Sequence, residues 1–270
     1  MNAQFDHEDS PGTVYLVGAG PGDPGLLTLR ALKLLQTADV ILPDDLVSDA
    51  ILDLASPSAL IIPVGKRCGQ PRITQAGIHA LMLEHARPID SEEPRSVLRL
   101  KSGDPLIFGR AGEEIAALRE ARIPFEIVPG ITAAFAVAAS LQTPLTDRTA
   151  ASRLILATAH HAAGKAALAT ALPGALPDDS TLVLYMPGRD FAALAQDLIH
   201  SGITPATPVV AVSKATTPEE HVTLTTVEQL GVAQVGPAPV LLLIGHAIQP
   251  AQPKDRLQPS AHDTMPQNTP

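Results

Sequence analysis

The stretch "VYLVGAGPGDPGLLTL", residues 14–29, decides the fold class of this chain. An apolar run over residues 14–17 is followed by Gly18, Gly20 and Gly22, and then by leucines at helical spacing. This order predicts a strand, a tight turn and a helix. The same order opens dinucleotide-binding domains, in which a G-x-G-x-x-G turn presents a helix N-terminus to a pyrophosphate.

The turn departs from that fingerprint in its chemistry. Asp23 stands where the third glycine is required, and its carboxylate would face the phosphates. Pro21 and Pro24 remove two N–H donors that a phosphate site would use. What remains is a rigid turn at the carboxyl end of a strand, where open α/β sheets bind ligands. A purely structural turn, capped by Asp23, is the alternative.

Apolar runs typical of strands recur along the chain, at residues 13–18, 39–43, 59–65, 96–100, 124–130, 152–159, 181–188, 207–215 and 239–245. Segments with helical periodicity, such as 26–38 and 112–123, lie between most of them. Strands that alternate with helices indicate parallel sheets, so we expect an α/β protein with two consecutive α/β domains. The expected bounds are 13–129 and 130–248, with a disordered N-terminus (1–12) and a disordered tail (249–270).

Composition excludes several classes of function. The chain has 270 residues and a net charge of -9, which argues against binding to a nucleic-acid backbone. No apolar run approaches the roughly 20 residues of a membrane span, and no signal peptide is visible, so we expect a cytoplasmic protein that does not contact a membrane. Cys68 is the single cysteine, and neither His160 with His161 nor His79 with His85 has metal-ligand spacing. No metal is therefore expected.

A second turn of the same kind follows another strand, in "RLKSGDPLIFGRAGEE" (99–114). Both Gly-Asp-Pro turns follow strands of one predicted parallel sheet, so both can reach the same edge. Asp104 could accept hydrogen bonds from a ribose or an amino group, and Gly103 would permit close approach of a ligand to the backbone. A helix N-cap is the alternative for Asp104.

Seven motifs in order now carry a resemblance: "VGAGPGDP" (17–24), "DDLVS" (44–48), "VGKR" (64–67), residues 99–114, "VPGITAA" (128–134), "PLTDR" (144–148) and "YMPG" (185–188). Over about residues 13–248 the chain resembles the tetrapyrrole (corrin/porphyrin) methylases. Within them it is most similar to members that methylate uroporphyrinogen III at C-2 and C-7 to give precorrin-2, for sirohaem and cobalamin biosynthesis. The resemblance implies S-adenosylmethionine as methyl donor, a cofactor cleft between the two domains, and a homodimer.

The resemblance also implies roles for individual residues. Asp44 corresponds to a proton acceptor and Lys66 to a proton donor. The cofactor-binding positions fall on Pro21, Ser102, Gly103, Asp104, Ile107, Thr132, Ala133, Met186 and Ala215. Without the family, Met186 and Ile107 would be assigned to the core. The small-molecule tetrapyrrole substrate carries eight carboxylates, for which we expect Arg67, Arg110 and Arg148 as partners, with Lys66, Arg72, Lys101 and Arg153 as further local positive charges.

The sequence departs from the family pattern in three places. Pro43 stands where the family usually has Tyr, Ser102 where it has Gly, and the segment after residue 158 lacks the usual Gly-His and Asp-Trp pairs. Three alternatives therefore stay open. They are a sister enzyme that methylates a later corrin precursor, an NAD(P)-dependent oxidoreductase, and a non-catalytic S-adenosylmethionine-binding module.

Overall fold

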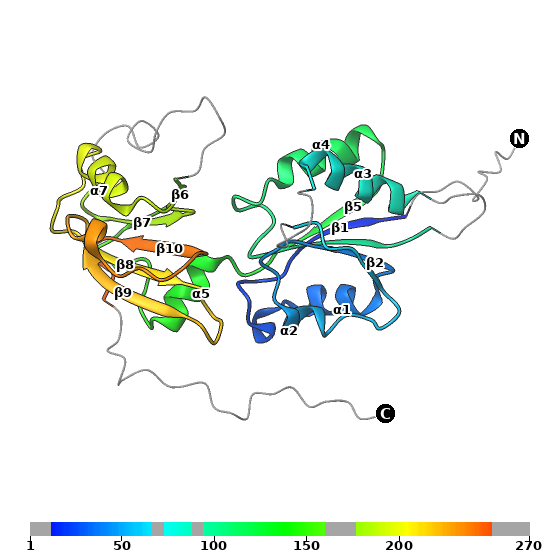
Figure 1. The fold of residues 1–270 in the computed structure, drawn as a ribbon, viewed down its shortest axis with the longest axis horizontal. Coiled ribbons are helices and arrows are strands. Elements are labelled where there is room, and N and C mark those ends of the chain that lie inside the picture. Colours follow the sequence, from blue (N-terminus) through cyan, green and yellow to red (C-terminus); the bar gives the residue numbers. More distant parts are fainter. Residues whose placement is uncertain (1–11, 66–72, 88–93, 160–176, 250–270) are drawn as a thin grey trace, which may run out of the picture. The chain divides into compact units, whose positions relative to one another are not determined.

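The computed structural model describes residues 12–65, 73–87, 94–159 and 177–249. They form a mixed α/β protein with two sheets of five strands each, which confirms the α/β class expected from the alternating pattern (Figure 1). The chain divides into two compact units, and the first passage from one to the other falls at Ala136 and Val137. Two later segments, Val212–His221 and Gly236–Leu241, group with the first unit.

The first sheet has the strand order β3-β2-β4-β1-β5. Its strands are β1 (Val14–Gly18), β2 (Val40–Pro43), β3 (Leu60–Ile61), β4 (Val97–Lys101) and β5 (Phe125–Val128). All neighbouring pairs are parallel, with Val14 opposite both Val97 and Phe125. The carboxyl ends of the strands therefore meet at one edge of the sheet, and the loops that leave this edge carry most of the motifs.

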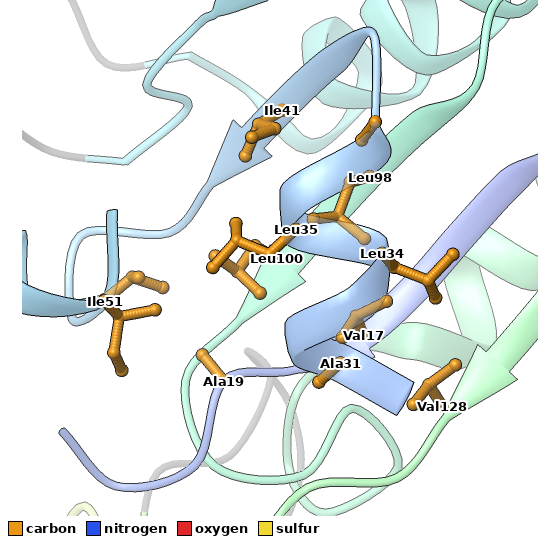
Figure 2. Packing of buried hydrophobic residues seen from close by; sticks show 12 residues of the cluster. Val17, Ala19, Ala31, Leu34, Leu35, Ile41, Ile51, Leu98, Leu100 and Val128 are labelled. Carbon is orange, nitrogen blue, oxygen red and sulfur yellow. The ribbon is translucent and has the colours of Figure 1, made fainter. Parts of the chain in front are cut away.

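Helices cover both faces of the first sheet (Figure 1). They are α1 (Leu29–Thr37), α2 (Asp49–Leu52), α3 (Gln75–Ala86) and α4 (Ala111–Glu120). Successive side chains of a strand point to opposite faces, and two cores result. Figure 2 shows the first, in which Leu34 and Leu35 of α1 pack beside Val17, Leu98 and Leu100.

The second core lies under α3 and α4. Met82 and Leu118 from these helices are fully buried against Val14 and Leu16 of β1 and Val97 of β4. The sheet is thus held from both sides, which fixes the strand ends rigidly in place.

The turn after β1 differs from a dinucleotide-binding turn. A short 3-10 helix, η2 (Pro24–Leu26), comes first, and the side chain of Asp23 caps it by accepting a hydrogen bond from the Gly25 N–H at 2.8 Å. The α-helix begins only at Leu29, where the Thr28 side chain accepts from the Ala31 N–H at 3.1 Å. No α-helix N-terminus therefore directly follows the glycines of this turn.

The second sheet has the order β6-β7-β10-β8-β9. Its strands are β6 (Arg153–Thr158), β7 (Ser180–Tyr185), β8 (Pro208–Ser213), β9 (His221–Thr226) and β10 (Val240–Ile244), and β6 and β7 are parallel. The accompanying helices are α5 (Ala133–Ser140), α7 (Phe191–His200) and the 3-10 helix η3 (Leu230–Val232).

Two elements differ from the sequence expectation. The strand expected over 59–65 is reduced to Leu60–Ile61, whose side chains lie exposed at the sheet edge. Backbone hydrogen bonds to β2 nevertheless continue beyond it, from the Ile62 N–H at 2.9 Å and the Val64 N–H at 3.1 Å. Strand β9 was not expected at all. Its sequence, "HVTLTT", has no continuous apolar run, and its side chains are only partly buried or exposed.

Candidate functional site

Three glycines bring the ends of β1, β4 and β5 into backbone contact. A Cβ on Gly18 would lie 2.5 Å from the Gly130 Cα and 2.6 Å from the Gly103 carbonyl oxygen. The two Gly-Asp-Pro turns are tied together as well, because Gly20 and Gly103 exchange backbone hydrogen bonds of 3.2 and 2.7 Å. The two turns that the sequence placed at one edge therefore lie side by side. We call Gly18, Gly103 and Gly130 the glycine junction.

Asp104 stabilises this junction through hydrogen bonds to both of its carboxylate oxygens. Oδ1 accepts a hydrogen bond from the Leu106 N–H at 2.8 Å, and Oδ2 accepts one from the Gly130 N–H at 3.0 Å. Asp104 is not the N-cap of α4, whose N-cap position is held by Arg110. Its carboxylate is fixed in place by the backbone and keeps lone pairs for a further donor.

At Gly103 an added Cβ would make only ordinary van der Waals contacts, unlike at the other two glycines of the junction. This residue is buried and has φ +69°, a conformation that favours glycine. An ideal Cβ there would meet nothing closer than the Thr132 Cα at 3.9 Å and the Ala133 N at 4.0 Å. Three residues expected to bind the cofactor, Gly103, Thr132 and Ala133, thus lie side by side, and Pro21 is next in sequence to Gly20 of the tied turn.

Ser102 and Ile107 flank Asp104 and are half-buried. The Ile107 N–H donates to the Asp104 carbonyl at 3.2 Å, so this residue belongs to the turn and does not enter the core as its apolar character alone suggested. Ser102 is absent from the described residues with positive φ, so a side chain is accommodated where the family usually has Gly.

A cavity of about 500 Å³ opens at the same strand ends. Asp44, Ser102 and Arg110 all line it, one residue from each of the three classes expected for catalysis, cofactor and substrate. Its other lining residues are Asp45, Leu46, Val64, Gly65, Ile73, Thr74, Gln75 and Ile78. Gly65 is held close to the Asp45 carboxylate and directly precedes Lys66 in the sequence.

A buried group of charges lies behind Asp44. The Arg99 guanidinium donates through Nη2 to Asp44 Oδ1 and through Nε to Glu114 Oε1 at 3.0 Å. The Lys101 ammonium lies 3.0 Å from both oxygens of Glu114. The side chains of Arg99, Lys101 and Glu114 are at most 3% exposed, whereas Asp44 is 33% exposed. We call these four residues the charge cluster.

Sequence reasoning missed Arg99 and Glu114 as members of a site. The signal was the alternation in "VLRLK" (97–101), which places Arg99 and Lys101 on one face of a strand that is buried on both faces. Two buried cations on one face require anionic partners. Burial is the main cause that lowers the pKa of Lys101 below its ordinary 10.5, neighbouring Arg99 lowers it further, and Glu114 opposes both.

Arg110 reaches the cavity from a strained position. It has φ +57° at the start of α4, and both Nε and Nη2 donate to the Glu113 carboxylate, at 2.8 and 2.7 Å. This exposed pair lowers the pKa of Glu113 and raises that of Arg110. Backbone strain in non-glycine residues concentrates at functional sites, which agrees with a site here.

The remaining expected residues lie on the second sheet or before it. Met186 follows β7 with φ +48° and is 45% exposed, so it is not the core residue that its type alone suggested. Ala215 follows β8, between Lys214 and Thr216, which both have positive φ.

Arg148 lies exposed in a turn that Asp147 and Ala151 close. The Asp147 carboxylate accepts from the Thr149 hydroxyl and from the N–H groups of Thr149 and Ala150, and these bonds lower its pKa. Arg153 is paired with Asp179 at 3.0 Å.

Other expected residues, Lys66, Arg67, Cys68, Arg72, His160 and His161, lie outside the described residues, as do the terminal segments 1–11 and 250–270. Within the described ranges no three His, Cys, Asp or Glu residues gather as metal ligands. None of the helices in those ranges is long and apolar enough to cross a membrane.

A protein-family model matches most of the chain. Residues 13–231 fit the model of the Tetrapyrrole (Corrin/Porphyrin) Methylases.

Individual proteins agree with this match. The uroporphyrinogen-III C-methyltransferase of Paracoccus denitrificans is 44% identical over 244 residues, which cover 89% of this chain and 83% of that protein. Siroheme synthase 1 of Cronobacter sakazakii is 40% identical over 92% of this chain, but the chain spans only 52% of its length. The uroporphyrin-III C-methyl transferase of Thermus thermophilus, solved with S-adenyl homocysteine, is 38% identical with a TM-score of 0.74, covering 87% of this chain and 98% of that one.

Proposed function

Because the chain belongs to the tetrapyrrole (corrin/porphyrin) methylase family, we propose that it transfers two methyl groups from S-adenosylmethionine to C-2 and C-7 of uroporphyrinogen III. The product is precorrin-2, reached through precorrin-1. The main observation behind the proposal is the cavity of about 500 Å³. It is lined by one residue expected to bind the cofactor, one expected to bind the substrate and one expected to accept a proton. The Paracoccus and Thermus relatives, named for the same activity, support it.

The residues present fit S-adenosylmethionine. Gly103 has no side chain to keep a ligand from the backbone, and Asp104 offers a fixed acceptor for a hydroxyl or amino group. A carboxylate at Asp23 does not repel a ligand without phosphate. We propose that Pro21, Ser102, Ile107, Thr132, Ala133, Met186 and Ala215 complete the binding site. When bound, S-adenosylmethionine supplies an electrophilic methyl group on its sulfonium.

The chain's contribution to the chemistry is positioning and proton transfer. Alignment of the methyl donor and the pyrrole carbon, with water excluded, accounts for most of the acceleration expected for such a reaction. Methylation of a substituted ring carbon requires loss of a proton elsewhere in the conjugated system. We propose that Asp44 accepts a proton and that Lys66 donates one.

The substrate's carboxylates need local positive charge, because the whole chain carries -9. We propose Arg67, Arg110 and Arg148 for this role. Arg110 lines the cavity, and Glu113 binds the Nε and Nη2 side of its guanidinium. Arginine can form two parallel hydrogen bonds with a carboxylate, which gives geometric selectivity as well as attraction.

We further propose that the protein works in the cytoplasm as a homodimer. Light scattering coupled to size-exclusion chromatography measures the mass in solution. Twice the chain mass of 28.1 kDa supports the dimer, and a single chain mass contradicts it.

The decisive experiment is anaerobic incubation of the purified protein with enzymatically generated uroporphyrinogen III and S-adenosylmethionine, followed by mass spectrometry of the tetrapyrrole. A gain of two methyl groups is expected. No gain, with S-adenosylmethionine still bound in calorimetry, would replace the proposal with a later corrin precursor or a non-catalytic binding module. Binding of NADH instead would favour the oxidoreductase.

A further inference from the structure

The charge cluster is balanced only when Asp44 carries a charge. Arg99 and Lys101 contribute two buried cations, and Glu114 contributes one fully buried anion. The second anion is Asp44, the one member with a partly exposed side chain and the one that lines the cavity. A buried cation without a partner is costly, and the Asp44 carboxylate is the partner that Arg99 reaches at the cavity wall.

Arg99 also fixes where that carboxylate points. Its Nη1 donates to the Leu42 carbonyl at 2.9 Å and to the Leu100 carbonyl at 3.4 Å, while Nε and Nη2 bind Glu114 and Asp44. The Asp44 N–H in turn donates to the Leu100 carbonyl at 3.0 Å. One planar guanidinium thus holds both the end of β2 and the side chain that follows it. Within the described residues, hydrogen bonding of Asp44 to Arg99 uses only Oδ1.

Glu114 connects the cluster to a second part of the cavity wall. Besides Arg99 and Lys101, its Oε1 lies 3.5 Å from Nε2 of Gln75 in α3, which also lines the cavity and lies 3.2 Å from His79 Nε2. Among the described residues, the charged and titratable groups of this network are Arg99 and Lys101 from β4, Glu114 from α4 and His79 from α3, and Asp45 and Arg110 line the cavity together with Asp44.

We propose that Arg99 is a positioning residue for Asp44, held in place by Glu114, so that one oxygen of the Asp44 carboxylate is engaged and the other is presented to the tetrapyrrole. This inference rests on the proposed function. Arg99 does not line the cavity, so it acts through Asp44 and not on the substrate. If the cluster only stabilised the packing of β2 and β4 against α4, its substitutions would lower stability without a specific fall in kcat.

The kinetic experiment compares Arg99→Lys and Glu114→Gln, each alone and combined with Asp44→Asn. Arg99→Lys keeps the charge but loses the planar fork, so we expect kcat to fall about 10- to 100-fold with KM and S-adenosylmethionine affinity little changed. Glu114→Gln keeps the shape, and we expect a smaller fall. In the Asp44→Asn background neither change should lower kcat further, because both act through Asp44.

A control is the exposed pair of Arg30 and Glu126, in which the arginine also donates through Nε and Nη2, at 3.1 and 2.7 Å, but to a single carboxylate. Arg30→Lys and Glu126→Gln should leave kcat unchanged. Equal falls of kcat with and without Asp44, or full activity of both Arg99→Lys and Glu114→Gln, would overturn the positioning role. Thermal unfolding of each variant identifies any that fails to fold, and Glu114→Gln then carries the comparison.

A second readout does not depend on activity. The chain has six lysines, so lysine labelled with ¹³C at Cε gives a spectrum in which Lys101 can be assigned with Lys101→Arg. Glu114 and Asp44 both raise the pKa of Lys101 against burial. Glu114→Gln and Asp44→Asn should therefore each lower the Lys101 titration midpoint, and Glu126→Gln should not. A midpoint unmoved by Asp44→Asn would overturn the cluster even if methylation is confirmed, whereas absent methylation by the wild type refutes only the proposed function.

Discussion

Asp44 is the residue on which sequence and structure converge most directly. It follows β2, lines the cavity and binds the buried Arg99. We expect Asp44→Asn to reduce kcat by about 100-fold or more, the usual loss for a general base, while the Kd for S-adenosylmethionine stays within twofold. Steady-state kinetics and calorimetry measure the two quantities. Wild-type turnover in this variant would remove the proton-acceptor role.

Lys101 makes stability depend on pH. Burial lowers its folded-state pKa below 10.5, so between the lowered value and 10.5 the unfolded state binds the proton and the folded state does not. Raising the pH through this window favours the folded state, by at most about 1.4 kcal/mol per pH unit. Below the lowered pKa both states bind the proton, and the unfavourable burial of the charged lysine is fully present.

Urea unfolding of the wild type and of Lys101→Met over a pH series tests this sign. The difference in unfolding free energy, wild type minus variant, should grow as pH rises through the window. If this free-energy difference shrinks with rising pH, folding does not lower the pKa of Lys101.

At the scale of elements, the glycine junction sets the spacing of three strands. Gly130→Ala would place a Cβ 2.7 Å from the Gly18 Cα and closer still to the Gly103 carbonyl, and all of these atoms belong to backbone that cannot move aside cheaply. We expect a loss of about 1–3 kcal/mol of stability from overpacking, with weaker S-adenosylmethionine binding. Chemical denaturation and calorimetry measure both.

Gly112 in α4 provides the matched control, since a Cβ there meets no atom within 4 Å. Gly112→Ala should stabilise the protein by about 0.5–1 kcal/mol through helix propensity alone. If both alanine variants behave alike, the junction is not the close contact described above.

At the scale of the whole molecule, the proposed function requires a chain of net charge -9 to bind a polyanion. Local arginines must therefore outweigh a repulsive background, and salt screens exposed charges over about 10 Å at 0.1 M. We expect porphyrinogen binding to weaken as salt rises, and Arg148→Ala to reduce this dependence while Arg122→Ala does not. Fluorescence titration with uroporphyrin III as a stable probe measures the affinities. An affinity independent of salt would count against an arginine site.

The sequence by itself determined the α/β class, nearly all strands and the two turns, because strand and helix periodicity and Gly-Asp-Pro chemistry are local properties. Asp44, Ser102 and Arg110 could be selected from motifs, although nothing in the chain order says that they share a cavity. The missed strand β9 and the shortened β3 lie at sheet edges, where each strand has a neighbour on one side only.

Only the tertiary structure decided the contacts between distant segments. Arg99 and Glu114 are 15 residues apart, and Arg99 and Asp44 are 55 apart, so their pairing depends on how β2, β4 and α4 pack. The same is true of Gly18, Gly103 and Gly130, whose contact arises from the parallel order of β4, β1 and β5. Burial determines how much each of these residues contributes, because an unpaired charge or an added side chain costs most where water and free space are absent.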